Sequence, residues 1–226
     1  MLRDNWVVVC DFDGTVTTED ASEAILAEFA DPVWRDIDEE YARGEIGLEE
    51  CIDRQFALVK APRAVLRAFV EERIVLRPHF REFAAWCRAQ GLELILLSGG
   101  LDFYIEAILE REGLADFRRV FCVATEFGPD GIRCRLPVDG RTSGGNADYK
   151  RAIVERLRAE GRRIAYLGDG LTDRQAVAVA DLVFARRKLL EHCRAAGLAC
   201  IPFEDFRDVQ RGLAAALGES TPFPCP

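Results

Sequence analysis

Short apolar runs that stop abruptly at a polar residue or a glycine recur along the chain, and they constrain its fold more than any other feature. The first, Trp6 to Cys10, ends at Asp11, and two later runs end in the glycine-rich segments 98–100 and 168–170. Segments with helical spacing of apolar residues separate these runs. Continuous β-branched runs are typical of strands buried on both faces. The alternation therefore predicts an α/β fold, an open parallel sheet with flanking helices.

The region after the first strand departs from this alternation. About 60 residues, from position 18 to position 75, have a helical pattern throughout, and the next strand comes only after them. We therefore predict a small helical cap domain at residues 18–75, inserted into a Rossmann-like core of residues 1–17 and 76–226. A smaller interruption at residues 121–136, two extended runs around a Gly-Pro-Asp-Gly turn, predicts a β-hairpin.

The composition excludes several classes of function. Lysine and arginine number 30 and aspartate and glutamate 39 among 226 residues, a net charge of −9, which argues against nucleic acid or an anionic membrane surface as a partner. No apolar stretch is long enough for a membrane span, and none of the eight cysteines forms a C-x-x-C pair. We expect a cytoplasmic protein with reduced thiols, and make no prediction of its oligomeric state.

Polar residues follow three of the predicted strands directly, and a lysine opens a helix between the second and the third. They are Asp11, Asp13, Ser98, Gly99, Lys150, Asp169 and Asp173. The carboxyl ends of parallel strands meet at one edge of a sheet, where ligands bind, so we expect these residues to lie together. Each alone is also explained as a turn or a helix cap.

Two other motifs are excluded by spacing. A calcium loop starting at Asp11 requires glycine at its sixth position, where Val16 stands. A dinucleotide fingerprint starting at Gly168 requires glycine where Asp173 stands.

Aspartates, a lysine and glycine-rich strand ends together fit phosphoryl transfer with Mg²⁺, a hard cation that prefers oxygen ligands. We predict that Asp11 is the nucleophile and forms an aspartyl-phosphate. Asp13 is predicted to protonate the leaving oxygen and then to deprotonate the attacking water. The phosphoryl oxygens are expected to bind Ser98, the backbone N–H groups around Gly99, and Lys150.

The predicted metal ligands are Asp11, Asp13 and Asp169. Asp173 is predicted to act without binding the metal directly. It either positions the groups that bind the metal or orients Lys150.

The same residues also resemble a known family. Residues 11–16 (DFDGTV), residues 98–103 (SGGLDF), Lys150 and residues 168–173 (GDGLTD) resemble the four ordered motifs of the haloacid dehalogenase-like superfamily of phosphatases. The resemblance implies a Rossmann-like core, Mg²⁺ as cofactor, a small phosphorylated metabolite as partner, and the roles given above at the same positions.

The helical insert resembles the cap of the phosphoserine phosphatase branch. Within this branch the chain, including residues 184–186 (FAR), residues 189–190 and Cys193, is most similar to the 2-hydroxy-3-keto-5-methylthiopentenyl-1-phosphate phosphatases of methionine salvage. This resemblance implies the corresponding substrate. Two alternatives stay open: a phosphoserine phosphatase, and a non-catalytic metabolite-binding protein on the same scaffold.

Three residues of the insert are candidates for substrate specificity. Asp20 either binds an amino group of the substrate or caps a helix with Glu23. Arg43 and Arg54 either clamp a substrate carboxylate or lie on a solvated helix surface.

Overall fold

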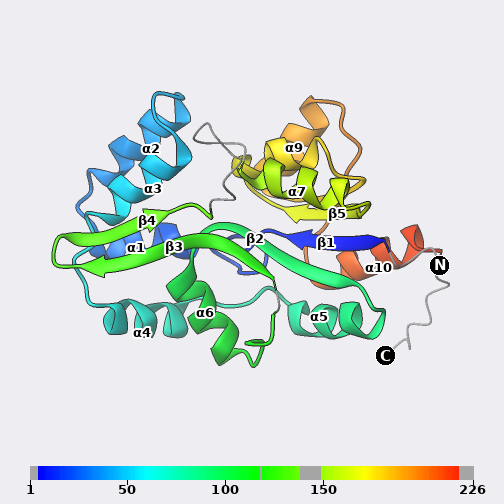
Figure 1. Cartoon of the computed structure of the whole chain (residues 1–226), viewed down its shortest axis with the longest axis horizontal. Coiled ribbons are helices and arrows are strands. Elements are labelled where there is room, and N and C mark those ends of the chain that lie inside the picture. The colour runs from blue at the N-terminus through cyan, green and yellow to red at the C-terminus, as the bar shows by residue number, and fades with distance from the viewer. Residues whose placement is uncertain (1–4, 118, 138–148, 219–226) are drawn as a thin grey trace.

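The computed structural model describes residues 5–117, 119–137 and 149–218. In these residues seven strands form one sheet in the order β4-β3-β2-β1-β5-β6-β7 (Figure 1). They are β1 (Trp6–Cys10), β2 (Glu93–Leu101), β3 (Val120–Gly128), β4 (Gly131–Arg135), β5 (Arg163–Gly168), β6 (Leu182–Ala185) and β7 (Ile201–Pro202). Every pair is parallel except β3 with β4. The predicted α/β fold with an open, mostly parallel sheet is confirmed.

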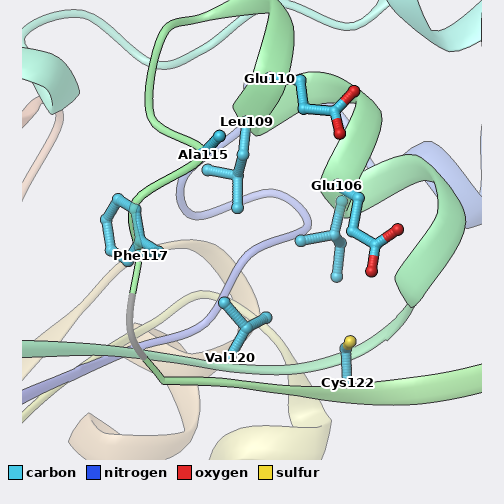
Figure 2. A pocket seen from close by; sticks show the side chains of 8 residues that line it. Glu106, Leu109, Glu110, Ala115, Phe117, Val120 and Cys122 are labelled. Carbon is cyan, nitrogen blue, oxygen red and sulfur yellow. The ribbon is translucent and has the colours of Figure 1, made fainter.

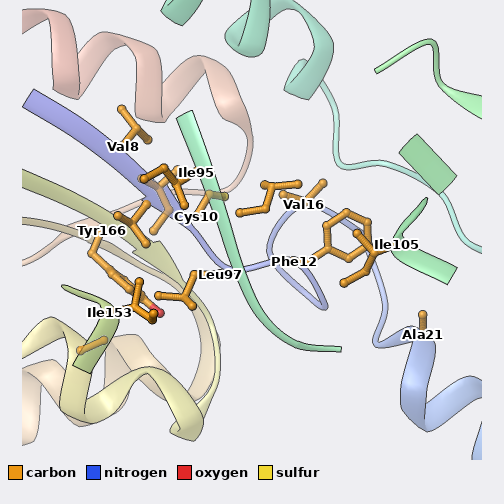
Figure 3. Close-up of a cluster of buried hydrophobic side chains, with 14 of the residues drawn as sticks. Val8, Cys10, Phe12, Val16, Ala21, Ile95, Leu97, Ile105, Ile153 and Tyr166 are labelled. Carbon is orange, nitrogen blue, oxygen red and sulfur yellow. The ribbon is translucent and has the colours of Figure 1, made fainter. Parts of the chain in front are cut away.

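Strand β1 lies at the centre of the sheet, as its continuous apolar run predicts. All five of its residues are buried, and it pairs with β2 on one side and β5 on the other. Figure 3 shows the core cluster to which Val8 and Cys10 belong together with Ile95 and Tyr166. Because β1 has neighbours on both edges and apolar packing on both faces, the residue that follows it has a fixed position.

Helices cover both faces of the sheet, with α7 and α9 on one side and α4, α5 and α6 on the other (Figure 1). The helices are α1 (Ala21–Phe29), α2 (Trp34–Ala42), α3 (Leu48–Phe56), α4 (Arg63–Arg73), α5 (Phe80–Ala89), α6 (Asp102–Arg111), α7 (Tyr149–Ala159), α8 (Arg174–Val177), α9 (Arg187–Ala195) and α10 (Phe206–Ala216). None of the described helices is long and apolar enough to cross a membrane.

The segment between β1 and α5 is helical, as predicted, and contains α1 to α4. Its two ends lie side by side: Thr17 forms an antiparallel bridge with Leu76, and the Thr18 N–H donates to the Val75 carbonyl at 2.9 Å. The chain therefore enters and leaves the helical segment at one place next to β1.

The predicted hairpin is present as β3 and β4, with Gly128 paired to Gly131 at its turn. It packs against α3, where the Asp53 carboxylate accepts hydrogen bonds from the Cys134 N–H at 2.8 Å and from Arg133 at 3.0 Å. Helices α2 and α3 lie on one side of the hairpin and α4 on the other (Figure 1). The hairpin is thus joined to the inserted helices as well as to the sheet.

Candidate active site

Asp11 directly follows β1, and its N–H still donates to the Leu167 carbonyl of β5 at 2.9 Å. The chain then turns at Gly14, whose φ is +72°. A side chain at Gly14 would collide with the carboxylate of Asp169, so the turn requires glycine twice, for its backbone conformation and for space. The turn brings the loop after β1 against the loop after β5.

Lys150, on α7, lies behind Asp11 with only 1% of its side chain exposed. Its ammonium donates to Asp11 Oδ1 at 2.6 Å and to Asp173 Oδ1 at 2.7 Å. Burial lowers the pKa of Lys150, but the two carboxylates raise it by more, so the pKa lies well above its ordinary value. The lysine is therefore a fixed positive charge at the end of β1.

Asp173 uses both of its carboxylate oxygens within the protein. Its Oδ1 accepts from Lys150 and also from the Tyr166 hydroxyl at 2.8 Å. Its Oδ2 accepts from the backbone N–H of Asp169 at 3.2 Å and from that of Gly170 at 3.1 Å. The contact with Lys150 agrees with one of the two predicted roles of Asp173, that of orienting the lysine. The contacts with the two N–H groups also fix the turn that carries Asp169.

Three carboxylates form a cluster: ligand atoms of Asp11, Asp169 and Asp173 lie within 4.8 Å of one another. Thr15 Oγ1 lies between the first two, 3.3 Å from Asp11 Oδ2 and 3.4 Å from Asp169 Oδ1. Burial, and next the charge of Asp173, raise the pKa of Asp11 well above its usual range and that of Asp169 to about 6.

The donor set of this cluster fits a divalent cation. Three carboxylates face one buried ammonium, that of Lys150, which leaves two negative charges without a buried counter-charge. All the donors are oxygens, which suits Mg²⁺. Because both oxygens of Asp173 are engaged, the groups suited to hold a cation are Asp11 and Asp169.

Asp13 does not belong to this cluster, although it was predicted as a metal ligand. Its Oδ2 accepts from the Tyr104 hydroxyl at 2.6 Å and from Ser98 Oγ at 3.4 Å, and its Oδ1 accepts from the Ala21 N–H at 3.0 Å. Burial, followed by the charge of Asp20, raises the pKa of Asp13 to about 7. A carboxyl group with this pKa gains and loses a proton near neutral pH, as acid–base catalysis requires.

The carboxyl end of β2 supplies the third side of the site. Ser98 is completely buried, and its Oγ accepts from the Gly100 N–H at 2.9 Å. A side chain at Gly100 would collide with Tyr104 and Asp13, so this end of the strand requires glycine there. The loops after β1 and β5 and the carboxyl end of β2 thus meet at one edge of the sheet together with Lys150, as the motifs predict.

Comparison with known proteins identifies the family. The model of the haloacid dehalogenase-like hydrolases matches residues 8–178, three quarters of the chain. The chain belongs to this family. Two bacterial relatives are each named 2-hydroxy-3-keto-5-methylthiopentenyl-1-phosphate phosphatase. One, from Bacillus velezensis, is 31% identical over 210 residues, which cover 92% of this chain and 89% of the relative. The other, from Geobacillus kaustophilus, is 34% identical over 207 residues, covering 90% and 93%.

Solved structures of phosphoserine phosphatase share the fold of this haloacid dehalogenase-like protein. An aspartyl-phosphate intermediate analogue of that enzyme superposes with a TM-score of 0.69 at 20% identity, covering 92% of this chain and 99% of the other. A substrate-bound complex gives 0.68 at 19% identity, covering 92% and 98%. The predicted family and the predicted phosphatase activity are confirmed by the family match and the named relatives.

Several residues of this haloacid dehalogenase-like site are not apparent from the sequence. Tyr104 holds Asp13, and Tyr166 holds Asp173. Arg77 is buried and donates to the carbonyls of Gly14 at 2.7 Å, Thr15 at 2.8 Å and Thr17 at 2.9 Å, which fixes the loop after β1. Tyr104 and Tyr166 lie within two residues of the second and the fourth motif, and this closeness is the one sequence signal that points to them. Nothing in the spacing points to Arg77.

The three specificity candidates lie in the inserted helices. Asp20 caps α1 and accepts from the Glu23 N–H at 2.9 Å. Arg43 pairs with Glu45 at 2.6 Å. Arg54 pairs with Glu40, also at 2.6 Å. The helix-cap interpretation of Asp20 therefore has a contact to support it, and the structure does not bring either arginine into the carboxylate cluster.

A separate hollow of about 310 Å³ lies between α6 and β3 (Figure 2). Its lining includes Ile105, Glu106, Leu109, Glu110, Phe117 and Cys122, and none of the residues of the carboxylate cluster. This hollow is not part of the active site of the hydrolase.

Proposed function

We propose that this chain is a Mg²⁺-dependent phosphomonoesterase that hydrolyses a small phosphorylated metabolite through an aspartyl-phosphate on Asp11. The observation that carries the proposal is the contact of buried Lys150 with Asp11 at 2.6 Å, beside a second aspartate, Asp13, with a pKa of about 7. Lys150 favours the ionised form of Asp11, and Asp13 is able to carry a proton near neutral pH. Nucleophilic attack and proton transfer need these two states at the same site.

The cation would be held by Asp11 and Asp169, the two carboxylates that share Thr15 as a hydrogen-bond donor. When bound, Mg²⁺ supplies the positive charge that allows a dianionic phosphate to approach these carboxylates. We assign Asp13 to proton transfer rather than to metal binding, since its carboxylate faces Tyr104.

In the first step, an oxygen of Asp11 attacks phosphorus, and the bond to the leaving oxygen breaks. Asp13, in its protonated form, gives its proton to that oxygen, so the alcohol leaves neutral. In the second step Asp13 takes a proton from water, which attacks the aspartyl-phosphate and releases inorganic phosphate and Asp11. Ser98, the N–H of Gly99 and Lys150 bind the phosphoryl oxygens as their charge changes.

We propose 2-hydroxy-3-keto-5-methylthiopentenyl-1-phosphate as the substrate and methionine salvage as the setting. The support is the name of the two relatives, which align with about nine tenths of this chain. Phosphoserine is the second candidate, because solved phosphoserine phosphatases share the fold. We further propose that residues 18–75 form a cap over a core of residues 1–17 and 76–226, and that the enzyme works in the cytoplasm.

The test is release of inorganic phosphate with Mg²⁺ from three compounds: the keto-enol phosphate, phosphoserine and a generic aryl phosphate. We expect the keto-enol phosphate to have the highest kcat/KM. A preference for phosphoserine would replace the proposed substrate by the second candidate.

The nucleophile is tested with Asp11→Asn, for which we expect a fall in kcat of about 10³-fold or more. The matched control is Asp116→Asn, which removes a carboxylate from an exposed pair with Arg88. Equal activity of wild type and Asp11→Asn would remove Asp11 as the nucleophile. Absence of phosphate release from all three compounds would favour the metabolite-binding alternative.

A further inference from the structure

Arg187 lies at the edge of the site, as the first residue of α9, just after β6; Asp169 directly follows the neighbouring strand β5. Gly168 of β5 pairs with Ala185 of β6, so the residues that follow the two strands are neighbours. Leu189, two residues after Arg187, donates its N–H to the Asp169 carbonyl at 3.0 Å. The start of α9 is therefore fixed to the loop that carries the carboxylate cluster.

The backbone of Arg187 has an unfavourable conformation, with φ at +45°. Among the described residues one other non-glycine, His79, has a positive φ, and histidine is a residue type that tolerates it better than arginine. A side chain with a Cβ is strained in this region, and such strain persists where the surroundings hold it, most often at functional sites. The strain at Arg187 points to a role that depends on where its side chain lies.

The side chain of Arg187 reaches the carboxylate cluster from the solvent side. Its Nη1 lies 3.7 Å from Asp169 Oδ2, and 57% of the Arg187 side chain is exposed against 12% of that of Asp169. A distance of 3.7 Å is too long for a hydrogen bond, so the contact is an attraction between charges. An exposed contact of this kind is weak and readily exchanged for another.

The preceding residue, Arg186, is held differently. Its Nη1 donates to the Gly14 carbonyl at 3.1 Å, and its guanidinium lies 5.9 Å from the centre of the Phe203 ring. Of the two consecutive arginines, Arg186 supports the loop after β1, whereas Arg187 has its charged group at the entrance of the cluster.

We propose that Arg187 is an anion-binding residue of this site, which pairs with Asp169 until a divalent cation binds that carboxylate and then contacts the phosphate group of the ligand. The inference rests on the proposed function, because it requires a cation on Asp169. A cation on Asp169 would neutralise the negative charge that attracts the guanidinium, and it would itself repel the guanidinium. An arriving phosphate is then the nearest strong anion for Arg187.

The experiment measures two binding equilibria by calorimetry on the whole chain, without turnover. Mg²⁺ is titrated into the metal-free protein, and inorganic phosphate into the Mg²⁺-loaded protein. For Arg187→Gln we expect Mg²⁺ to bind about two- to fivefold more tightly, because an exposed competitor for Asp169 is gone. Phosphate should bind about tenfold more weakly, because a charge-assisted contact is lost.

Two further variants separate this role from a structural one. Lys188→Gln removes the same charge from the next, exposed residue and should leave both affinities unchanged. Arg187→Lys keeps the charge and should retain most of the phosphate affinity. A merely structural role for Arg187 would not change the two affinities in opposite directions.

Unchanged affinities in Arg187→Gln, or equal effects in Lys188→Gln, would overturn the inference and leave the proposed function standing. Failure of the wild-type protein to bind Mg²⁺ would instead overturn both.

Discussion

Two ion pairs of this protein have the same distance between their charged atoms, but one pair is buried and the other is exposed to solvent. At the end of β1, Lys150 lies 2.6 Å from Asp11 with 1% of its side chain exposed. Between α2 and α3, Arg54 lies 2.6 Å from Glu40 with 40% of its side chain exposed. The distances do not distinguish the two pairs; exclusion of water does. The buried carboxylates keep Lys150 protonated and hold its ammonium in place, whereas solvent screens the pair of Arg54 and Glu40 and leaves it exchangeable.

The sharpest test of this comparison is to remove the cation from each pair. Lys150→Met leaves the buried Asp11 without its counter-charge, which costs about 3 kcal/mol of unfolding free energy, or roughly 6–12 °C in the melting temperature. Arg54→Met should change the melting temperature by roughly a degree or less. Thermal unfolding of both variants at pH 7 measures the difference. Equal losses would show that burial does not separate the two pairs.

The loss of unfolding free energy in Lys150→Met should also depend on pH. The pKa of Asp11 is already raised by burial, and it rises further when the lysine is gone. The folded protein then holds a proton that the unfolded chain has released above about pH 4. Protonation relieves the unpaired charge, so the destabilisation is expected to be smaller at pH 5 than at pH 8.

The second prediction concerns the metal-free wild-type protein, whose stability should fall as the pH rises from 5 to 8. The pKa values of Asp13, about 7, and Asp169, about 6, lie above their unfolded values. The folded state therefore binds more protons than the unfolded state in this window, which weakens it by roughly 2–4 kcal/mol in all. Saturating Mg²⁺ should remove the part of this slope that comes from Asp169, because it favours the ionised form of that carboxylate. Chemical denaturation with and without a chelator measures both slopes; a stability that rises with pH in the chelated protein would contradict the prediction.

The third prediction probes a single buried hydrogen bond. Tyr104→Phe removes the donor 2.6 Å from Asp13 Oδ2, which raises the pKa of Asp13 further and lowers kcat about tenfold at pH 7. The matched control is Tyr149→Phe, since the buried Tyr149 hydroxyl has no hydrogen-bond partner among the residues that the structure describes. A pH profile of kcat that is identical for wild type and Tyr104→Phe would show that this tyrosine does not act through Asp13.

The smallest effect on activity is expected for the exposed ion pair of Arg54 and Glu40. If Arg54 contacts the substrate, it must first leave Glu40, so Arg54→Gln should raise KM by only about twofold and leave kcat unchanged. Glu40→Gln frees the arginine and should lower KM by a similar factor. An unchanged KM in both variants would show that Arg54 does not bind the substrate.

The sequence predicts the centre of the molecule better than its periphery, for a physical reason. The buried strands contain continuous apolar runs, and the catalytic residues follow them directly, so local pattern locates both Asp11 and Asp169. The partners of those residues are brought together by the fold. Tyr104 meets Asp13, and Arg77 meets Gly14, across long stretches of chain whose path local pattern does not define.

In the inserted helices, too, local sequence pattern does not predict which distant residues come into contact. The spacing of Glu50 and Arg54 by four residues is visible in the sequence, but the closer contact of Arg54 with Glu40 depends on how α2 packs on α3. The docking of the predicted β-hairpin on α3 through Asp53 likewise has no local signal.

The central place of β1 bears on how the protein is made. Trp6 of β1 pairs with Arg163 of β5, so β1 leaves the ribosome long before one of its two neighbouring strands has been synthesised. Until then its apolar residues and one of its hydrogen-bonding edges lack their final partners. Contacts so distant in sequence form slowly and leave newly made chains prone to aggregate. A shortened chain that ends before β5 would keep Asp11 and Asp13 and still lack the strand that holds them in place.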